Sequence, residues 1–322
     1  METTVSDSPP EHLSLIIDLS PTQWHLSSLD TNPQPLSLRL FISQVLVFLN
    51  AHLASRHDNT IAVLVALPGK NVMIYSSSDT IEESDHQSPL DESNTYQPFR
   101  AMNSAVVQRI DEELGAQEHG ETEAPIGLVG ALTKALCHIN RLTHPTASAN
   151  PSIAVPTPPN PRILIFSVSP DLSTAYIPLM NSIFSAQKLK VAIDVCKLYG
   201  EDTVFLQQAA HLTGGLYVNP ERRDALLQYL AMCFLPSTAI RRVLGMPTQD
   251  HVDFRAACFC HKNIIDIGYI CSVCLSIFCS PVPVCSTCRT KFPIKTLQRL
   301  MLNRPSPLSN GHQRTASPAP QR

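Results

Sequence analysis

The chain has 322 residues, of which 43% are hydrophobic and 16% charged, and its net charge is −3. This length accommodates about two domains, and the composition is that of a globular protein rather than a disordered or fibrous one. No apolar run approaches the roughly 20 residues that span a bilayer, so we expect no membrane partner.

The charges are unevenly distributed and most of the cysteines are clustered. From Gly268 onward there is no Asp or Glu but seven Lys or Arg, so the preceding part carries 17 basic and 27 acidic residues. The ten cysteines could indicate disulfides, but the polar segment after Met1 lacks the pattern of a signal peptide. We therefore expect a soluble intracellular protein whose clustered cysteines bind metal.

Strand-like and helix-like patterns alternate through the first half of the chain. Short apolar runs predict strands, and apolar residues at three- and four-residue spacing predict helices. The predicted strands are residues 13–19, 60–67 and 71–76, and the predicted helices are residues 35–56, 101–114 and 125–142. The turn Pro68-Gly69-Lys70 joins the second and third strands into a hairpin.

Four segments of this half lack such a pattern. We expect residues 1–12 to be disordered and residues 77–98 to form an acidic, solvated insertion. Residues 118–123 form a second acidic linker, and residues 144–161 contain six prolines and predict a loop.

The alternation resumes after the proline-rich segment. The predicted strands are residues 162–169, 190–196 and 216–218, and the predicted helices are residues 172–187, 203–212 and 224–234. Such an order implies parallel strands joined by right-handed crossovers, with helices on both faces and the hairpin adding one antiparallel edge strand. The sequence thus predicts an α/β domain over residues 13–238, with Cys137, Cys196 and Cys233 buried in its apolar segments.

The first strand ends in Asp18-Leu19-Ser20, and an α/β sheet that opens this way resembles the von Willebrand A family. In that family an Asp-x-Ser-x-Ser loop, with a Thr and an Asp from later loops, holds Mg²⁺. Here Thr22 replaces the second Ser, Thr122 is the only plausible loop threonine, and the later acid is absent or displaced to Asp171. We therefore expect Asp18 and Ser20 to mark a degenerate, empty magnesium site in which Asp18 forms a turn or caps a helix.

Seven of the ten cysteines lie between Cys258 and Cys288. Two Cys-x-x-Cys pairs ten residues apart match the spacing at which four thiolates surround one zinc ion. The predicted ligands are Cys271, Cys274, Cys285 and Cys288. Four thiolates leave no open coordination position, so the zinc is expected to be structural, in a C4 module over residues 251–303 followed by a disordered tail over 304–322.

The remaining donors of this region are Cys258, Cys260, His261 and Cys279. They could complete a second zinc site. Alternatively, Cys279 packs as an apolar thiol, and Cys258 and Cys260 extend the small core. The spacing does not decide between these interpretations.

An α/β domain followed by this cysteine pattern resembles the smaller von Willebrand A and zinc-finger subunits of the core of the transcription and DNA-repair factor TFIIH. The likeness covers residues 13–302, and its most discriminating part is residues 256–288. It implies a non-catalytic nuclear subunit that acts in nucleotide excision repair and in transcription initiation by RNA polymerase II. It also implies docking on the zinc-binding end of the larger von Willebrand A subunit, within a core that contains two DNA helicases.

Two other functions are possible. Seven Cys and one His equal the ligand number of a RING-like ubiquitin ligase, but His261 follows a Cys-x-Cys instead of lying between central cysteines. The basic end could bind nucleic acid, but its charges are spread out with few aromatic residues, so direct binding is not expected. The sequence has no phosphate-binding loop, nucleophile elbow or His-Glu-x-x-His motif, which favours a non-enzymatic protein.

Overall fold

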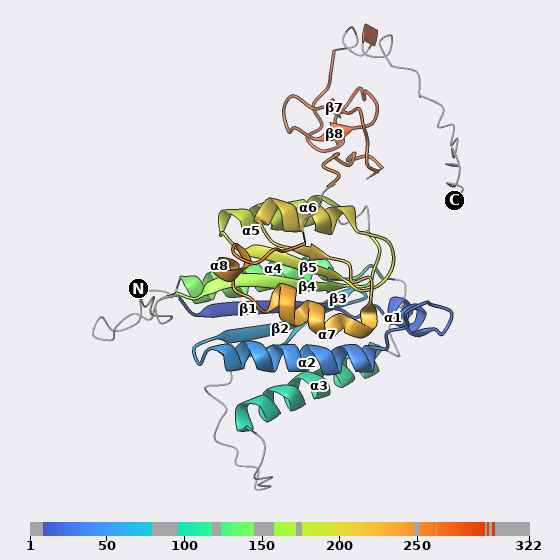
Figure 1. The fold of residues 1–322 in the computed structure, drawn as a ribbon. Coiled ribbons are helices and arrows are strands. Elements are labelled where there is room, and N and C mark those ends of the chain that lie inside the picture. The colour runs from blue at the N-terminus through green and yellow to red at the C-terminus, as the bar shows by residue number, and fades with distance from the viewer. Residues whose placement is uncertain are drawn as a thin grey trace, which may run out of the picture. The chain divides into compact units, whose positions relative to one another are not determined.

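The computed structural model describes residues 9–78, 96–117, 124–144, 158–171, 176–247 and 252–299, except residues 262, 294, 296 and 297. Several predictions fall wholly or partly outside these residues: the disordered start, the acidic insertion and linker with Thr122, the proline-rich loop, the beginning of the helix at 172–187, and the tail. The chain divides into two compact units, Met1–Phe254 and Arg255–Arg322, and each is described by itself (Figure 1).

A six-stranded sheet forms the centre of the first unit, with the strand order β3-β2-β1-β4-β5-β6. The strands are β1 (Glu11–Asp18), β2 (Thr60–Leu67), β3 (Lys70–Ser76), β4 (Asn160–Ser167), β5 (Ala192–Lys197) and β6 (Tyr217–Val218). All neighbours are parallel except the hairpin partners β2 and β3, which confirms the predicted sheet. Glu11 and His12, expected to be disordered, belong to β1 because they pair with Asn160 and Thr60.

Helices cover both faces of this sheet, as predicted (Figure 1). One face carries α2 (Leu38–Ser55), α3 (Gln97–Gln117) and α7 (Leu226–Tyr229), and the other carries α4 (Leu128–Thr143), α5 (Tyr176–Lys188) and α6 (Val204–Thr213). By length and composition alone α2 could cross a membrane. Its Phe41, however, packs edge-on against Phe166 of β4 with ring centroids 5.0 Å apart, so α2 is a core helix.

Three helical features and one cysteine differ from the prediction. The short helices α1 (Pro21–Ser28) and α8 (Thr238–Arg241) were not predicted. The predicted helix at 224–234 consists of a 3-10 turn, α7 and a π-helical turn, Leu230–Phe234. Cys137 is exposed rather than buried because the buried side of α4 runs through Leu132, Leu136 and Ile139. Cys196 and Cys233 are buried, as predicted.

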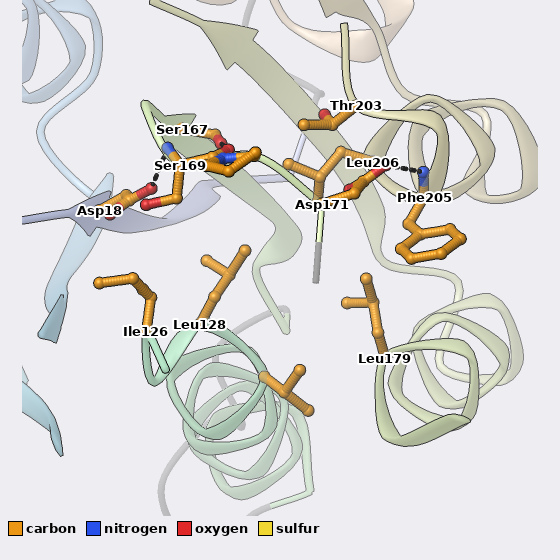
Figure 2. Close-up of a pocket in the computed structure, with 12 residues that line it drawn as sticks. Asp18, Ile126, Leu128, Ser167, Ser169, Asp171, Leu179, Thr203, Phe205 and Leu206 are labelled. Atoms are coloured by element: carbon orange, nitrogen blue, oxygen red, sulfur yellow. Dashed lines mark hydrogen bonds between the residues drawn. The ribbon is translucent and has the colours of Figure 1, made fainter. Parts of the chain in front are cut away.

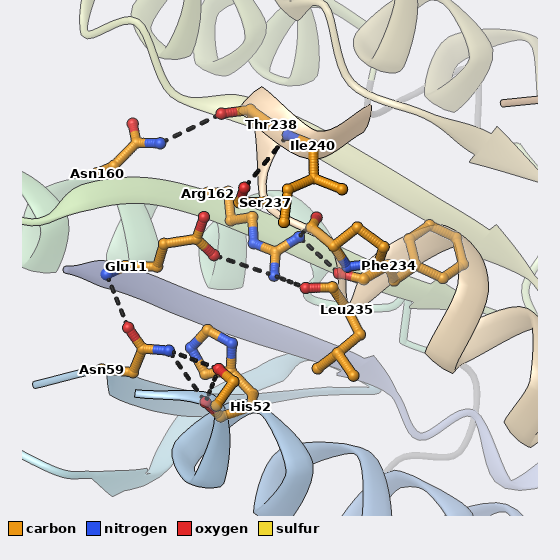
Figure 3. A network of polar contacts seen from close by, with 12 residues as sticks. Glu11, His52, Asn59, Asn160, Arg162, Phe234, Leu235, Ser237, Thr238 and Ile240 are labelled. Atoms are coloured by element: carbon orange, nitrogen blue, oxygen red, sulfur yellow. Dashed lines mark hydrogen bonds and ion pairs between the residues drawn. The ribbon is translucent and has the colours of Figure 1, made fainter. Parts of the chain in front are cut away.

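A buried arginine joins the sheet to the helices that end this unit (Figure 3). The Arg162 side chain is 2% exposed, donates to the carbonyl oxygens of Phe234 and Leu235, and lies 3.4 Å from the carboxylate of Glu11. The guanidinium therefore provides partners for carbonyl groups at the end of the π-helical turn, which have none within the helix. Nearby, Arg241 donates to both carboxylate oxygens of Asp194, at 2.7 and 2.8 Å.

Candidate metal centres

The second unit has short strands and a small buried cluster. Strands β7 (Tyr269–Ile270) and β8 (Ile277–Phe278) pair antiparallel. Among the described residues, its cluster comprises Cys271, Phe278 and Cys285, with Phe259, Cys274, Val282, Cys288 and Phe292 packed around them. Half of these side chains are cysteines, so apolar burial alone is a weak source of stability for this unit.

The thiols of Cys271, Cys274, Cys285 and Cys288, here called the four-cysteine set, converge as the sequence predicted. Their sulfur atoms lie within 4.8 Å of one another, with 3.7 Å between Cys271 and Cys288 and 3.5 Å between Cys274 and Cys285. A tetrahedron with Zn–S bonds of about 2.3 Å has S–S edges of about 3.8 Å, so the set could hold a metal ion of this geometry. The hydroxyl and backbone N–H of Ser276 lower the pKa of Cys274 to about 6, which favours the thiolate that binds metals.

Two matching turns present these thiols. The N–H of Leu275 donates to the carbonyl of Cys271, and the N–H of Arg289 donates to the carbonyl of Cys285, both at 2.9 Å. Leu275 and Arg289 have φ angles of 59° and 60°, a left-handed conformation that is uncommon outside glycine. Each Cys-x-x-Cys pair is thus enclosed by the same tight turn.

Cys258, Cys260, His261 and Cys279, here called the histidine-containing set, converge as well. Their donor atoms also lie within 4.8 Å of one another and could hold a metal ion. The sulfur of Cys279 is 3.5 Å from that of Cys260 and 3.2 Å from Nδ1 of His261. The two sets alternate along the chain, because Cys279 lies between the two Cys-x-x-Cys pairs.

In the first unit, the carboxyl ends of the strands bring Asp18 close to the loop after β4 (Figure 2). One oxygen of Asp18 accepts from the backbone N–H groups of Val168 and Ser169, at 3.1 and 2.8 Å, and the other accepts from the N–H of Ser20 at 3.2 Å. Burial raises the pKa of Asp18, and these hydrogen bonds oppose that shift. The geometry favours the interpretation of Asp18 as a turn former, while Thr22 is exposed on α1.

The displaced acid, Asp171, does not join Asp18. Its carboxylate accepts from the N–H of Phe205 at 3.1 Å, at the start of α6 (Figure 2). The pocket between the two carboxylates has a volume of about 40 Å³ and is lined mainly by apolar side chains such as Ile126 and Leu179. That space is far below the several hundred cubic ångströms of a typical small-molecule site.

Sequence reasoning missed the role of Lys197 at this edge of the sheet. Its side chain is buried, and its ammonium group donates to the carbonyl oxygen of Ser169 at 2.6 Å. Burial lowers the pKa of Lys197 to about 8, although the carboxylates of Asp18, Asp171 and Asp202 act in the opposite direction. The chain itself thus supplies positive charge to the strand ends, through Lys197. Von Willebrand A domains with an intact site use Mg²⁺ at this place.

Comparison with known proteins agrees on one family. A family model described as "Transcription factor Tfb4" matches residues 10–289, which include both cysteine sets. The chain is 38% identical to general transcription and DNA repair factor IIH subunit tfb4 of Schizosaccharomyces pombe, over 91% of this chain and 93% of that protein. It is 39% identical to general transcription factor IIH subunit 3 of Dictyostelium discoideum, over 82% and 70% of the two chains.

A solved structure extends the likeness to the fold. The crystal structure of the TFIIH p34 N-terminal domain superposes with a TM-score of 0.58 at 30% identity and covers 70% of this chain and 98% of that one. The first unit therefore has the predicted von Willebrand A-like α/β fold.

Proposed function

The chain belongs to the Tfb4 family of transcription factors, and from this premise we propose that it is a non-catalytic subunit of the TFIIH core. The family match over residues 10–289 carries the proposal because it spans both the α/β domain and the cysteine-rich module. In this role the chain acts in the nucleus, in nucleotide excision repair and in transcription initiation by RNA polymerase II. Its partners are the other core subunits, including the two helicases.

Within the core, the α/β domain docks on the zinc-binding end of the larger von Willebrand A subunit. The strand ends support docking without a bridging ion, since Asp18 and Asp171 already accept hydrogen bonds from backbone N–H groups. Lys197 supplies the nearby positive charge. Binding then depends on surface shape and apolar contact rather than on a shared cation.

The four-cysteine set holds a structural zinc ion. Its four sulfur atoms have the spacing of tetrahedral ligands, and four thiolates leave no position open for a substrate or water. When bound, zinc crosslinks two loops of a unit whose apolar cluster is small. The basic segment that follows Cys288 does not bind nucleic acid directly, because its charges are spread out along the chain.

Purification of the tagged full-length chain from nuclear extract tests core membership. We expect the TFIIH core, including both helicases, to co-purify; recovery of the folded chain without any TFIIH subunit would reject the proposal. Co-expression with the larger von Willebrand A subunit, intact or lacking its zinc-binding end, tests docking. Equal binding of both forms would reject the docking site and leave core membership standing.

The alternation of the four-cysteine and histidine-containing sets favours one second candidate, a RING-like ubiquitin ligase, because cross-braced ligand sets are a feature of that class. The chain departs from it in placing His261 directly after a Cys-x-Cys. The test is discharge of ubiquitin from a charged E2 enzyme by the purified chain. We expect no acceleration over E2 alone, and an acceleration that is lost in a Cys271→Ser variant would establish the ligase.

A further inference from the structure

We propose that Cys258, Cys260, His261 and Cys279 bind a second zinc ion, so that the module holds two ions with interleaved ligand sets. Three thiolates and one imidazole are a common donor set of structural zinc. The 3.5 Å contact between Cys260 and Cys279 and the 3.2 Å contact between His261 and Cys279 are close to the edges of a zinc tetrahedron, about 3.6 to 3.8 Å.

Packing in the small core does not explain this convergence. Cys260 and His261 are exposed, and none of the four side chains belongs to the buried cluster found among the described residues of the module. Of the four residues in this set, only Cys258 is buried. Exposed thiols and an exposed imidazole gain little from apolar burial, whereas a shared metal ion requires that their donor atoms meet.

At the end of strand β8, one residue of the histidine-containing set directly follows a residue packed against the four-cysteine set. Phe278 is 3% exposed and packs in the cluster that contains the thiols of the four-cysteine set, while the next residue, Cys279, belongs to the histidine-containing set. Strand β8 ends at Phe278 and Cys279 follows in a bend, so the two neighbouring residues serve different clusters. The N–H of Phe259 donates to the carbonyl of Ile277 at 2.7 Å, which holds the segment with Cys258 and Cys260 against the same strand.

The interleaving makes each ion support the other. The loop that an ion at the histidine-containing set would close, from His261 to Cys279, contains Cys271 and Cys274. The loop that an ion at the four-cysteine set would close, from Cys274 to Cys285, contains Cys279. Each ion therefore restrains the segment that presents a ligand to the other and reduces the chain entropy lost when the second site forms.

Native mass spectrometry of the full-length chain, purified in the presence of zinc, measures the number of bound ions. We expect two zinc ions per chain, and one in a Cys258→Ser, Cys279→Ser double variant. Cys137→Ser is the matched control because Cys137 is exposed and lies outside both sets; it should retain two. A single ion in the unmodified chain, or two ions in the double variant, would overturn the proposal.

His261→Cys provides a test that does not depend on losing an ion. This variant should still bind two ions, and its cobalt-substituted form should show the visible spectrum of two all-thiolate sites in place of one all-thiolate and one mixed site. An unchanged cobalt spectrum would overturn the assignment of His261 as a ligand. Zinc binding by the four-cysteine set and TFIIH membership do not depend on either result, since one ion at that set satisfies both.

Discussion

The α/β domain buries a six-stranded sheet between two layers of helices, whereas the described part of the cysteine-rich module buries a few side chains, half of them cysteines. A fully buried apolar side chain contributes about 1.5 to 3 kcal/mol, so the first unit draws on many such contributions and the second on very few. The first unit can therefore fold on apolar burial, and the second needs an additional crosslink.

The two units also differ in how they supply positive charge to clustered anionic groups. In the α/β domain, the buried ammonium of Lys197 lies at the strand ends near the carboxylates of Asp18 and Asp171. In the module, the thiols of the four-cysteine and histidine-containing sets have no such cation among their described contacts, and each set could hold a metal ion. One unit contains its own cation, and the other is predicted to recruit one.

The largest expected effect is the loss of zinc from the four-cysteine set. A Cys271→Ser, Cys274→Ser variant should lose bound zinc and unfold the module while the α/β domain stays folded, because structural zinc contributes roughly 10 kcal/mol of apparent folding free energy. Zinc counting by native mass spectrometry and hydrogen exchange of residues 255–299 against 9–247 would show this, with Cys137→Ser as the control. An unchanged zinc count would contradict the ligand assignment.

Breaking the Arg162 network should destabilise the α/β domain by a smaller amount. Arg162→Ala removes a buried cation from Glu11 and a donor from the carbonyl groups of Phe234 and Leu235, at an expected cost of about 3 to 5 kcal/mol. The carbonyl of Phe234 keeps one donor, Arg241. Urea unfolding followed by tryptophan fluorescence measures it well, because the single tryptophan, Trp24, is buried in this domain. Arg39→Ala, on the exposed side of α2, is the control; equal losses would contradict the proposed role.

The histidines of the same domain predict a loss of stability in mild acid. Burial lowers the pKa of His12 to about 3 and that of His52 to about 4; the neighbouring His138 adds to the shift at His12, and Arg162 to that at His52. Since the unfolded chain takes up these protons near pH 6.5 and the folded chain does not, stability is complete above about pH 6.5 and falls below it. Each of the two histidines should lower the free energy of unfolding by about 2 kcal/mol as the pH falls from 6.5 to 5.

The measurement is the free energy of urea unfolding across this pH range. His12→Asn should flatten the slope, whereas His57→Gln should leave it unchanged because the His57 side chain is 96% exposed. Stability that does not fall between pH 6.5 and pH 5 would show that the buried histidines are protonated in the folded chain.

Much of this difference between the units could be predicted from the sequence. Apolar periodicity identified the sheet and its main helices, and spacing identified the four-cysteine set. Helix α1 was missed because only Trp24 and Leu26 in its eight residues are large and apolar, although Ser20-Pro21 is a typical helix start. The histidine-containing set could not be separated from core thiols because the assignment depends on how the chain folds just after β8, where Phe278 packs in the cluster and Cys279 lies 3.2 Å from His261.

The role of Lys197 was equally hidden, because it depends on the register that places the end of β5 beside the end of β4.

The buried cation of Lys197 leads to the smallest effect we predict, which concerns the response of the α/β domain to Mg²⁺ and gives the sharpest contrast with the module. If the strand ends bound an ion, a free ion concentration 100 times the dissociation constant would stabilise the domain by about 2.7 kcal/mol. We expect millimolar Mg²⁺ to leave the unfolding free energy unchanged, as reported by Trp24, whose indole N–H donates to the carbonyl of Asp18 at 2.8 Å. Lys197→Met is the matched variant: it removes the cation while Asp18 keeps its three backbone donors. A stabilisation by Mg²⁺ in the unmodified chain would show that the strand ends still bind an ion, and that the two units differ only in which metal they take.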